Sequence, residues 1–291
     1  MISLKKAYRS DKDKLMPLIL EGFEVNKNSK PVQLKLKSFF NQLFDIRWAS
    51  NSEHIGYYLE NKEQIPVGFN GYIFSKRKIG EKIYKLCNLT TWVVKKEYSR
   101  YGILLYKPVE KLKLTHIITN YSPSVPSQFV LNRMGFYVLD QTKYLLPIIP
   151  HYKFLDIFKI KRKIDFTTIN SNEKKIYNDH ISSKIIFLQY FKNHENLLIG
   201  CKRVYKRRIP FLEIMYLNNK DLFYKNIQVL RSILNLKFNT LGLIIDSRFL
   251  NNKKINLSLK LKTKGMKLIY SNNIDTSEID NLYSELIFIS V

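Results

Sequence analysis

Residues 89–102 read LTTWVVKKEYSRYG, and this stretch decides the fold that the sequence predicts. Residues 89–94 are leucine, threonine, tryptophan and valine, a composition typical of a strand. A polar turn follows, and apolar periodicity then predicts a helix over residues 101–112, opening at Gly102, and a strand over residues 116–120. Such a turn presents unpaired N–H groups and the positive end of a helix dipole, which suits a pyrophosphate.

The rest of the first half predicts further elements around this unit. Apolar spacing predicts one helix from Ser10 or Asp11 to Phe23 and another over residues 38–48. Pro108 predicts that the 101–112 helix is kinked or starts later, because a proline inside a helix removes a backbone hydrogen bond. The other elements expected here are strands over residues 2–7, 55–59 and 67–74, a short helix over 127–133 and a strand from Phe136.

The second half of the chain repeats the strand–helix–strand order. Residues 211–216 predict a strand, residues 223–234 a helix with one apolar face, and residues 241–247 a buried strand. The polar residues Asn218–Asp221 stand where a second pyrophosphate turn would have its glycine. We therefore expect this half to shape an acceptor pocket or an interface.

Basic, proline-containing sequence from Pro147 to Lys163 separates the two halves. The sequence therefore predicts two domains, residues 1–150 and residues 151–291. The segment Ile279–Leu286 is amphipathic, and we expect it to pack as an ordered part of the fold.

The strand–turn–helix–strand unit resembles the acetyl-CoA-binding core of the GNAT acyltransferases. The family's turn carries Arg or Gln, two free positions, Gly, one free position and then Gly or Ala. The corresponding positions here are Ser99, Gly102 and Leu104; the central glycine is kept, and Arg100 lies one place late. The resemblance implies an α/β (α+β) fold of two GNAT-like domains, each a mixed, twisted, mostly antiparallel sheet with a splayed central pair of parallel strands flanked by helices.

The resemblance also implies where an acyl-CoA would bind. In the family the fourth and fifth strands diverge, and the acyl-pantetheine arm hydrogen-bonds to the fourth. We expect Arg100 and the amides of residues 101–104 to hold the pyrophosphate. The alternative is that Gly102 only permits a tight turn. The full set of expected cofactor-binding residues is Trp92, Val93, Val94, Ser99, Arg100, Tyr101, Gly102, Ile103, Leu104 and Ser124.

The resemblance leaves the catalytic groups open. The tyrosine that protonates the leaving thiolate in the family is replaced by Leu131. Tyr121 and Ser122 are candidate substitutes, with packing as the alternative role of Tyr121, and a water could serve because a thiolate leaves readily. Glu97 is the candidate proton acceptor. The alternatives for that role are Asp140, Glu213 and His180.

The formal net charge of +25 predicts an anionic partner. Acetyl-CoA or another acyl-CoA, a nucleotide sugar, tRNA, an acidic carrier protein or an anionic membrane face would fit. The alternative is a solvated lysine-rich surface, since the charges are spread along the whole chain.

Cysteine and histidine positions predict no metal site. Cys87 and Cys201 are far apart in sequence, and the five histidines lack ligand spacing. No apolar run approaches the length needed to cross a bilayer, and the first residues lack the core of a signal peptide. We expect a cytoplasmic protein, with the inner face of the membrane as an alternative location.

Three functions are compatible with these features. The leading hypothesis is a CoA-dependent acyltransferase, acetyl for preference, acting on an amine or hydroxyl of a small acceptor such as a sugar of cell-surface polysaccharide biosynthesis. The second is an aminoacyl-tRNA-dependent aminoacyl transferase. The third is a non-catalytic GNAT-like module that binds an anionic partner.

Overall fold

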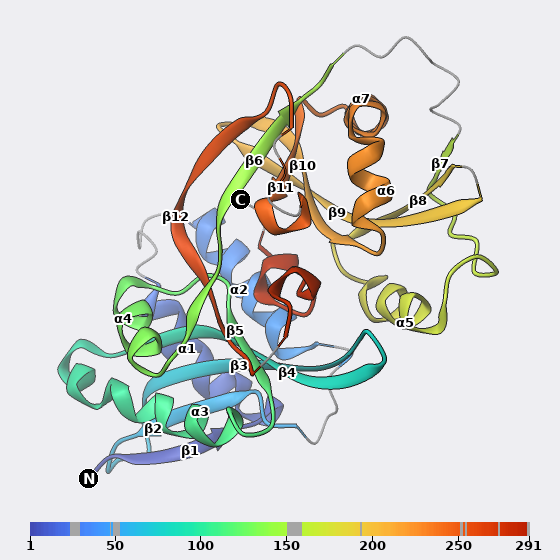
Figure 1. Ribbon diagram of the computed structural model, residues 1–291. Coiled ribbons are helices and arrows are strands. Elements are labelled where there is room, and N and C mark those ends of the chain that lie inside the picture. Colours follow the sequence, from blue (N-terminus) through green and yellow to red (C-terminus); the bar gives the residue numbers. More distant parts are fainter. Residues whose placement is uncertain are drawn as a thin grey trace. The chain divides into compact units, whose positions relative to one another are not determined.

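The structure, a computed structural model, divides into two compact units (Figure 1). Unit 1 consists of Met1–Leu139, Gly265–Ile274 and Tyr283–Phe288, and unit 2 of Asp140–Lys264, Asp275–Leu282 and Ile289–Val291. The residues that the structure describes are 1–23, 30–46, 48, 53–149, 159–192, 194–250, 253, 255–272 and 274–289.

Unit 1 contains a mostly antiparallel sheet in the order β1-β2-β3-β4-β5-β12. β4 and β5 run parallel, whereas the other neighbouring strands with a described register run antiparallel. The strands are β1 (Ser3–Ala7), β2 (Gly56–Glu60), β3 (Pro66–Ile79), β4 (Lys82–Val94), β5 (Ile117–Asn120) and the part of β12 (Leu259–Tyr270) from Gly265 onward.

Four α-helices lie among the described residues of unit 1. They are α1 (Lys12–Gly22), α2 (Lys30–Phe44), α3 (Lys107–Leu112) and α4 (Val125–Arg133). Leu89 of β4 and Ile118 of β5 pack with Val109 of α3 and Leu131 of α4, so these two helices cover one face of the parallel strands. The predicted helix ending at Phe23 is confirmed as η1 (Arg9–Asp11) followed by α1. The 38–48 helix is α2, which begins earlier than predicted, at Lys30, and ends earlier, at Phe44.

The helix predicted to open at Gly102 opens later, at Lys107. Residues Lys96–Tyr106 form instead the 3-10 helix η2. Pro108 therefore falls in the first turn of α3. The N–H groups of a first turn have no acceptor within the helix, so the N–H that proline lacks costs no helical hydrogen bond. The prediction of a helix from residue 101 was wrong, and the alternative of a later start is confirmed.

The strands of unit 2 follow the order β7-β8-β9-β10-β11-β6. β10 and β11 run parallel, and their neighbours run antiparallel to them. The strands are β7 (Ile160–Lys161), β8 (Ile186–Lys192), β9 (Glu195–Lys206), β10 (Ile209–Leu217), β11 (Gly242–Asp246) and the part of β6 (Tyr137–Pro147) from Asp140 onward. The helical segments are α5 (Ser171–His180), α6 (Lys220–Lys225), α7 (Ile227–Phe238), η4 (Ser247–Leu250) and η5 (Thr276–Glu278).

The predicted strand–helix–strand of the second half is present with one break. The helix expected over residues 223–234 is divided into α6 and α7 at Asn226, whose side-chain amide donates to the Leu222 carbonyl at 2.8 Å. The predicted apolar face is confirmed, because Phe223, Ile227, Leu230 and Leu234 all lie in one buried cluster.

The two units share an order of strands: an antiparallel series, a parallel pair joined through helices, and an antiparallel strand supplied by a distant part of the chain. The units differ from the expected ranges 1–150 and 151–291, because the first boundary lies between Leu139 and Asp140 and because residues 265–274 and 283–288 belong to unit 1. The physical reason is pairing: β5 would otherwise present an unpaired edge, and Leu268–Tyr270 of β12 cover it.

Thr91 is a β-bulge in β4. Asn70 of β3 pairs with Trp92 and Gly71 pairs with Thr90, so Thr91 is the extra residue, and its φ is +51°. A positive φ is strained for a β-branched residue because Cβ approaches the carbonyl oxygen. A bulge also bends a strand and increases its twist.

We predict that Thr91→Gly is more stable than Thr91→Ala by about 1 kcal/mol, because glycine alone adopts a positive φ without strain. Urea unfolding of the two variants measures the difference. An alanine variant at least as stable as the glycine variant would show that residue 91 is not left-handed.

Candidate functional site

The parallel ladder between β4 and β5 is short and ends inside β4. Over the rest of its length, to Val94, β4 pairs with β3. Residues 82–120 are all described, and within them the β4–β5 ladder ends at Asn88 and Thr119, one residue before β5 ends at Asn120, which agrees with the predicted splayed pair. The paired residues are Leu86 with Ile117, Cys87 with Ile118 and Asn88 with Thr119.

The end of this ladder leaves one backbone edge of β4, beyond Asn88, without a neighbouring strand in the part of the chain that the structure describes. Lys95 N–H donates to the Val67 carbonyl of the β3 side at 2.9 Å. Alternate residues of an antiparallel ladder bond to the same neighbour, so the backbone groups of Trp92 and Val94 point away from β3. Among the described residues, no strand other than β3 pairs with residues 90–94. We call this the open edge of β4.

Unit 2 has the corresponding edge, but part of its own chain occupies it. The β10–β11 ladder ends at Glu213 and Ile244, and the register of β10 shifts directly afterwards. There the Asn281 N–H donates to the Met215 carbonyl at 3.0 Å. The segment Asp275–Leu282 therefore takes the place that the open edge of β4 leaves free.

Gly102 packs against two side chains of β4. A Cβ added to it would lie 3.0 Å from Trp92 Cζ2 and 3.2 Å from Val94 Cγ2, so glycine allows η2 to approach the strand closely. The Trp92 indole Nε1 is buried and has no hydrogen-bond partner among the described residues. Trp92, Val94 and Gly102 are thus brought together, next to a donor that is free for a ligand.

The other predicted pyrophosphate residues line η2. Ser99, Arg100 and Ile103 are exposed, and Tyr101 and Leu104 are half-buried. Arg100 Nη2 donates to Tyr101 Oη at 2.9 Å, and its guanidinium lies 4.8 Å from the centre of that ring. The cation is therefore held at the surface of the turn by its neighbour.

Ser124 lies at the N-terminus of α4. Its Oγ accepts a hydrogen bond from the Ser127 N–H at 3.4 Å, the contact of an N-cap. Val93, the remaining predicted backbone contact, is buried and faces α1, where its Cγ1 would lie 2.7 Å from a Cβ on Gly22.

A buried carboxylate lies where β4 and β5 part. Glu285 is 1% exposed, and its Oε2 accepts from Asn88 Nδ2 at 2.5 Å. Its Oε1 accepts from Ser122 Oγ, also at 2.5 Å, and Thr119 Oγ1 donates to Asn88 Oδ1 at 3.1 Å. The partners of Glu285 are therefore Asn88, from the last pair of the ladder, and the predicted Ser122, which is itself exposed; Thr119, the other member of that pair, bonds to Asn88.

Burial raises the pKa of Glu285 above its ordinary value; hydrogen bonds from Ser122 and Asn88 and the charge of Lys267 oppose the shift in part. Lys267 is 6% exposed, and its Nζ lies 5.4 Å from the centre of the Tyr121 ring. The predicted Tyr121 is therefore buried, and its ring lies against the Lys267 ammonium group. A carboxylate that holds its proton more tightly is a stronger base once ionised.

Sequence reasoning did not select Glu285. The one available signal is an acid inside the otherwise apolar run after Ser284, SELIFI over residues 284–289. The predicted acceptor Glu97 is exposed on η2 and is not among the contacts of this site.

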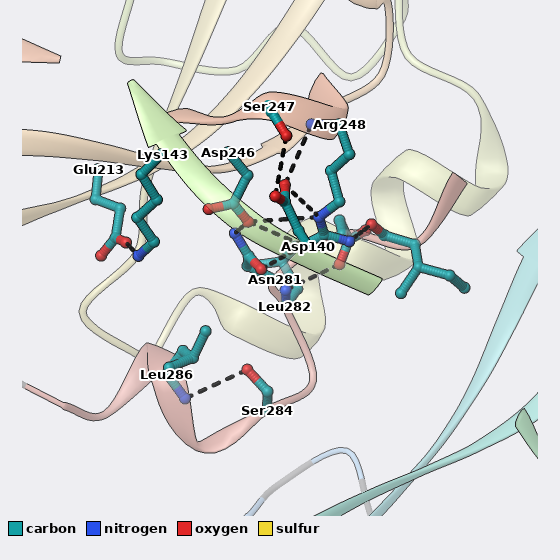
Figure 2. A network of polar contacts seen from close by, with 12 residues as sticks. Asp140, Lys143, Glu213, Asp246, Ser247, Arg248, Asn281, Leu282, Ser284 and Leu286 are labelled. Atoms are coloured by element: carbon teal, nitrogen blue, oxygen red, sulfur yellow. Dashed lines mark hydrogen bonds and ion pairs between the residues drawn. The ribbon is translucent and has the colours of Figure 1, made fainter. Parts of the chain in front are cut away.

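The alternative acids have other partners in unit 2. Glu213 accepts from Lys143 and lies 3.4 Å from Lys202 Nζ. Figure 2 shows Asp140 accepting from Ser247 and from the Arg248 backbone N–H, while Arg248 is paired with Asp246. These contacts tie Asp140 and Glu213 into the packing of unit 2. His180 is fully buried beside the Ile176 carbonyl.

A small hollow of about 20 Å³ adjoins the bulge of β4 in unit 1. Its walls are largely apolar, and Thr90 and Thr91 supply the polar ones. The residues that line it are Phe40, Leu43, Phe44, Ile55, Phe69, Gly71, Tyr72, Ile73, Thr90 and Thr91.

No protein-family model and no curated protein matches the chain. Solved structures do. A GCN5-related N-acetyltransferase from Anabaena variabilis is 10% identical, with a TM-score of 0.57 over 92% of this chain and 72% of that one. N-myristoyltransferase from Saccharomyces cerevisiae with bound myristoyl-CoA is 10% identical, with a TM-score of 0.50 over 97% and 89%. The chain has the GNAT fold.

The GNAT fold confirms the predicted fold class, and at these identities the likeness concerns the fold alone. A protein from Pyrococcus horikoshii with a provisional assignment as an acetyltransferase is 13% identical, with a TM-score of 0.55 over 96% of this chain and 93% of that one. The GNAT fold therefore extends across nearly the whole chain.

Two further features concern only the described residues. None of their helices is both long and apolar enough to pass through a membrane. No three of their histidine, cysteine, aspartate or glutamate side chains gather closely enough to hold a metal ion.

We predict that Glu285→Gln becomes more stable relative to the parent protein as pH rises from about 4 to 8. A carboxyl whose pKa is raised by folding loses stability as pH climbs from its unfolded pKa towards the folded one, and glutamine lacks this titration. Glutamine keeps the shape and can still bond to Asn88 and Ser122. Urea unfolding of both proteins across this pH range measures the difference, and a constant difference would contradict a raised pKa.

Proposed function

We propose that the chain is a CoA-dependent acyltransferase that moves an acyl group, with acetyl as the first candidate, to an amine or hydroxyl of a small acceptor. The observation that carries the proposal is the open edge of β4, which starts beside the buried carboxylate of Glu285. The shared GNAT fold supports the proposal without fixing it. A sugar acceptor stays a prediction.

The open edge of β4 fits the pantetheine arm of CoA. Pantetheine is an extended chain with amide groups, and the backbone of Trp92 and Val94 offers donors and acceptors along an extended strand. The unpartnered Trp92 Nε1 beside Gly102 would be satisfied by a ligand oxygen. Arg100 would exchange its contact with Tyr101 for a charge-assisted bond to the pyrophosphate.

Ser122 and Glu285 would move the proton. The acceptor nitrogen or oxygen attacks the thioester carbonyl carbon, and the C–S bond breaks. Ser122 takes the acceptor's proton while its own proton passes to Glu285 Oε1, with which it is already hydrogen-bonded. The thiolate leaves with the electron pair of the C–S bond and takes a proton from water or from Glu285.

The hollow beside Thr90 and Thr91 favours a short acyl group. Its volume of about 20 Å³ is close to that needed for a single water molecule. An acetyl methyl group matches this space, whereas a long acyl chain would have to displace Phe40 or Phe44. This supports acetyl over longer donors.

The non-catalytic alternative has one observation in its favour. Trp92 and Val94 pack so closely on Gly102 that η2 leaves little room between them. In that case the open edge of β4 would be a remnant, and CoA would not bind. Transfer from aminoacyl-tRNA is a further alternative, favoured only by the net charge.

We predict that acetyl-CoA binds with a stoichiometry near one, because Asn281 occupies the corresponding edge in unit 2. Arg100→Ala should weaken binding about 10- to 100-fold through loss of a charge-assisted bond. Arg133→Ala is the matched control, since Arg133 is also exposed and stacked, 4.1 Å from the Phe129 ring. Isothermal titration calorimetry measures all three proteins. Absence of binding to the parent protein would support the non-catalytic alternative. Binding of two molecules of acetyl-CoA would contradict the inference that the corresponding edge in unit 2 is occupied.

We predict that Ser122→Ala and Glu285→Gln each lower turnover about 10²- to 10⁴-fold while acetyl-CoA binding is kept. Release of CoA thiol in the presence of a panel of amines and amino sugars measures turnover. The parent rate should rise with pH until the raised pKa of Glu285 is passed, and that rise should be lost in Glu285→Gln. Full activity of both variants would remove these residues from the mechanism.

A further inference from the structure

The hairpin that joins β9 and β10 ends in five consecutive exposed residues, Tyr205–Ile209, which we call the β9–β10 tip. Lys206 pairs with Ile209, so Arg207 and Arg208 form a two-residue turn. Tyr205 is 46% exposed and Ile209 41% exposed. The tip therefore presents three consecutive cations between an aromatic and an aliphatic side chain.

The geometry of this turn is strained for the two arginines that form it. Arg207 and Arg208 have φ of +51° and +69°. A two-residue turn with both φ positive favours Asn-Gly, and other side chains are strained there. Strain of this kind is typical of positions whose side chains serve a function.

The cations of the β9–β10 tip are available to a ligand. No acid among the described residues forms an ion pair with Lys206, Arg207 or Arg208. An unneutralised cluster at the end of a hairpin attracts anions.

The corresponding hairpin of unit 1 is also basic, although Lys78 forms an ion pair with Glu81 there, at 3.1 Å. Between β3 and β4, Lys76, Lys78, Lys82 and Lys85 are exposed, and Ile83 is 73% exposed. Lysine or arginine beside an exposed isoleucine thus recurs at one position of the shared strand order.

We propose that the β9–β10 tip docks the protein on an anionic lipid surface. Cations bind lipid phosphate and carboxylate groups, while an aromatic and an aliphatic side chain enter the boundary between headgroups and acyl chains. Nucleic acid is the other polyanion to consider, and Tyr205 could stack on a base, but the exposed aliphatic Ile209 offers a base neither a stacking face nor a hydrogen bond and suits acyl chains instead. The inference does not depend on the proposed transferase activity.

The test uses the full chain with Arg207→Asn and Arg208→Gly combined. Asn-Gly is the preferred pair for this turn, so the variant should unfold at a higher temperature than the parent protein. Its binding to vesicles of phosphatidylcholine and phosphatidylserine, measured by co-sedimentation, should fall about 10- to 30-fold. Stability and binding would then move in opposite directions, which a folding defect cannot produce.

A matched control removes two charges elsewhere in unit 2, by Lys163→Asn and Lys225→Asn, both at exposed positions. It should change vesicle binding far less, whereas Ile209→Thr should weaken it several-fold. Absence of binding of the parent protein to anionic vesicles, or equal losses in the two double variants, would overturn the proposal. So would loss of single-stranded RNA binding by the tip variant, measured by fluorescence anisotropy, with vesicle binding unchanged.

Discussion

The early end of the parallel β4–β5 ladder is the constraint on which the candidate site depends. Backbone hydrogen bonds hold the strands together as far as Asn88 and Thr119, and the bulge at Thr91 then turns β4. Beyond that point, on the side away from β3, no strand of the described residues pairs with Trp92 or Val94. A continuous ladder would leave no donor or acceptor for an extended ligand and no opening beside Glu285.

The same strand order serves two purposes in this chain. In unit 1 the edge of the first strand of the parallel pair stays open, and a carboxylate lies at its start. In unit 2 the Asn281 N–H of the segment Asp275–Leu282 donates to the Met215 carbonyl. The Asn281 side chain accepts a hydrogen bond from Arg248 and donates one to Asp246. One unit therefore carries the features of a binding site, while the polar groups of the other are used within its own packing.

Local patterns in the sequence were enough to predict β4, β5, α1 and the parallel pair of the second half, because apolar periodicity and β-branched composition act over a few residues. The start of α3 was missed, since the run before Pro108 forms a 3-10 helix whose apolar spacing resembles that of an α-helix. Ser122 was selected from its position after β5, and the structure places it on Glu285. Glu285 itself was missed, because it is 197 residues from Asn88 and only the tertiary fold joins them.

Residues 265–274 and 283–288 complete unit 1 although all of unit 2 up to Lys264 precedes them in the chain. During synthesis the ribosome therefore releases the first five strands of unit 1 long before β12, which borders β5 on the side away from β4, exists. Until then the edge of β5 is unpaired, and an unpaired strand edge promotes association with other chains. Contacts between residues so far apart in sequence slow folding. A chaperone that covers the unpaired edge of β5 would therefore raise the yield of folded protein.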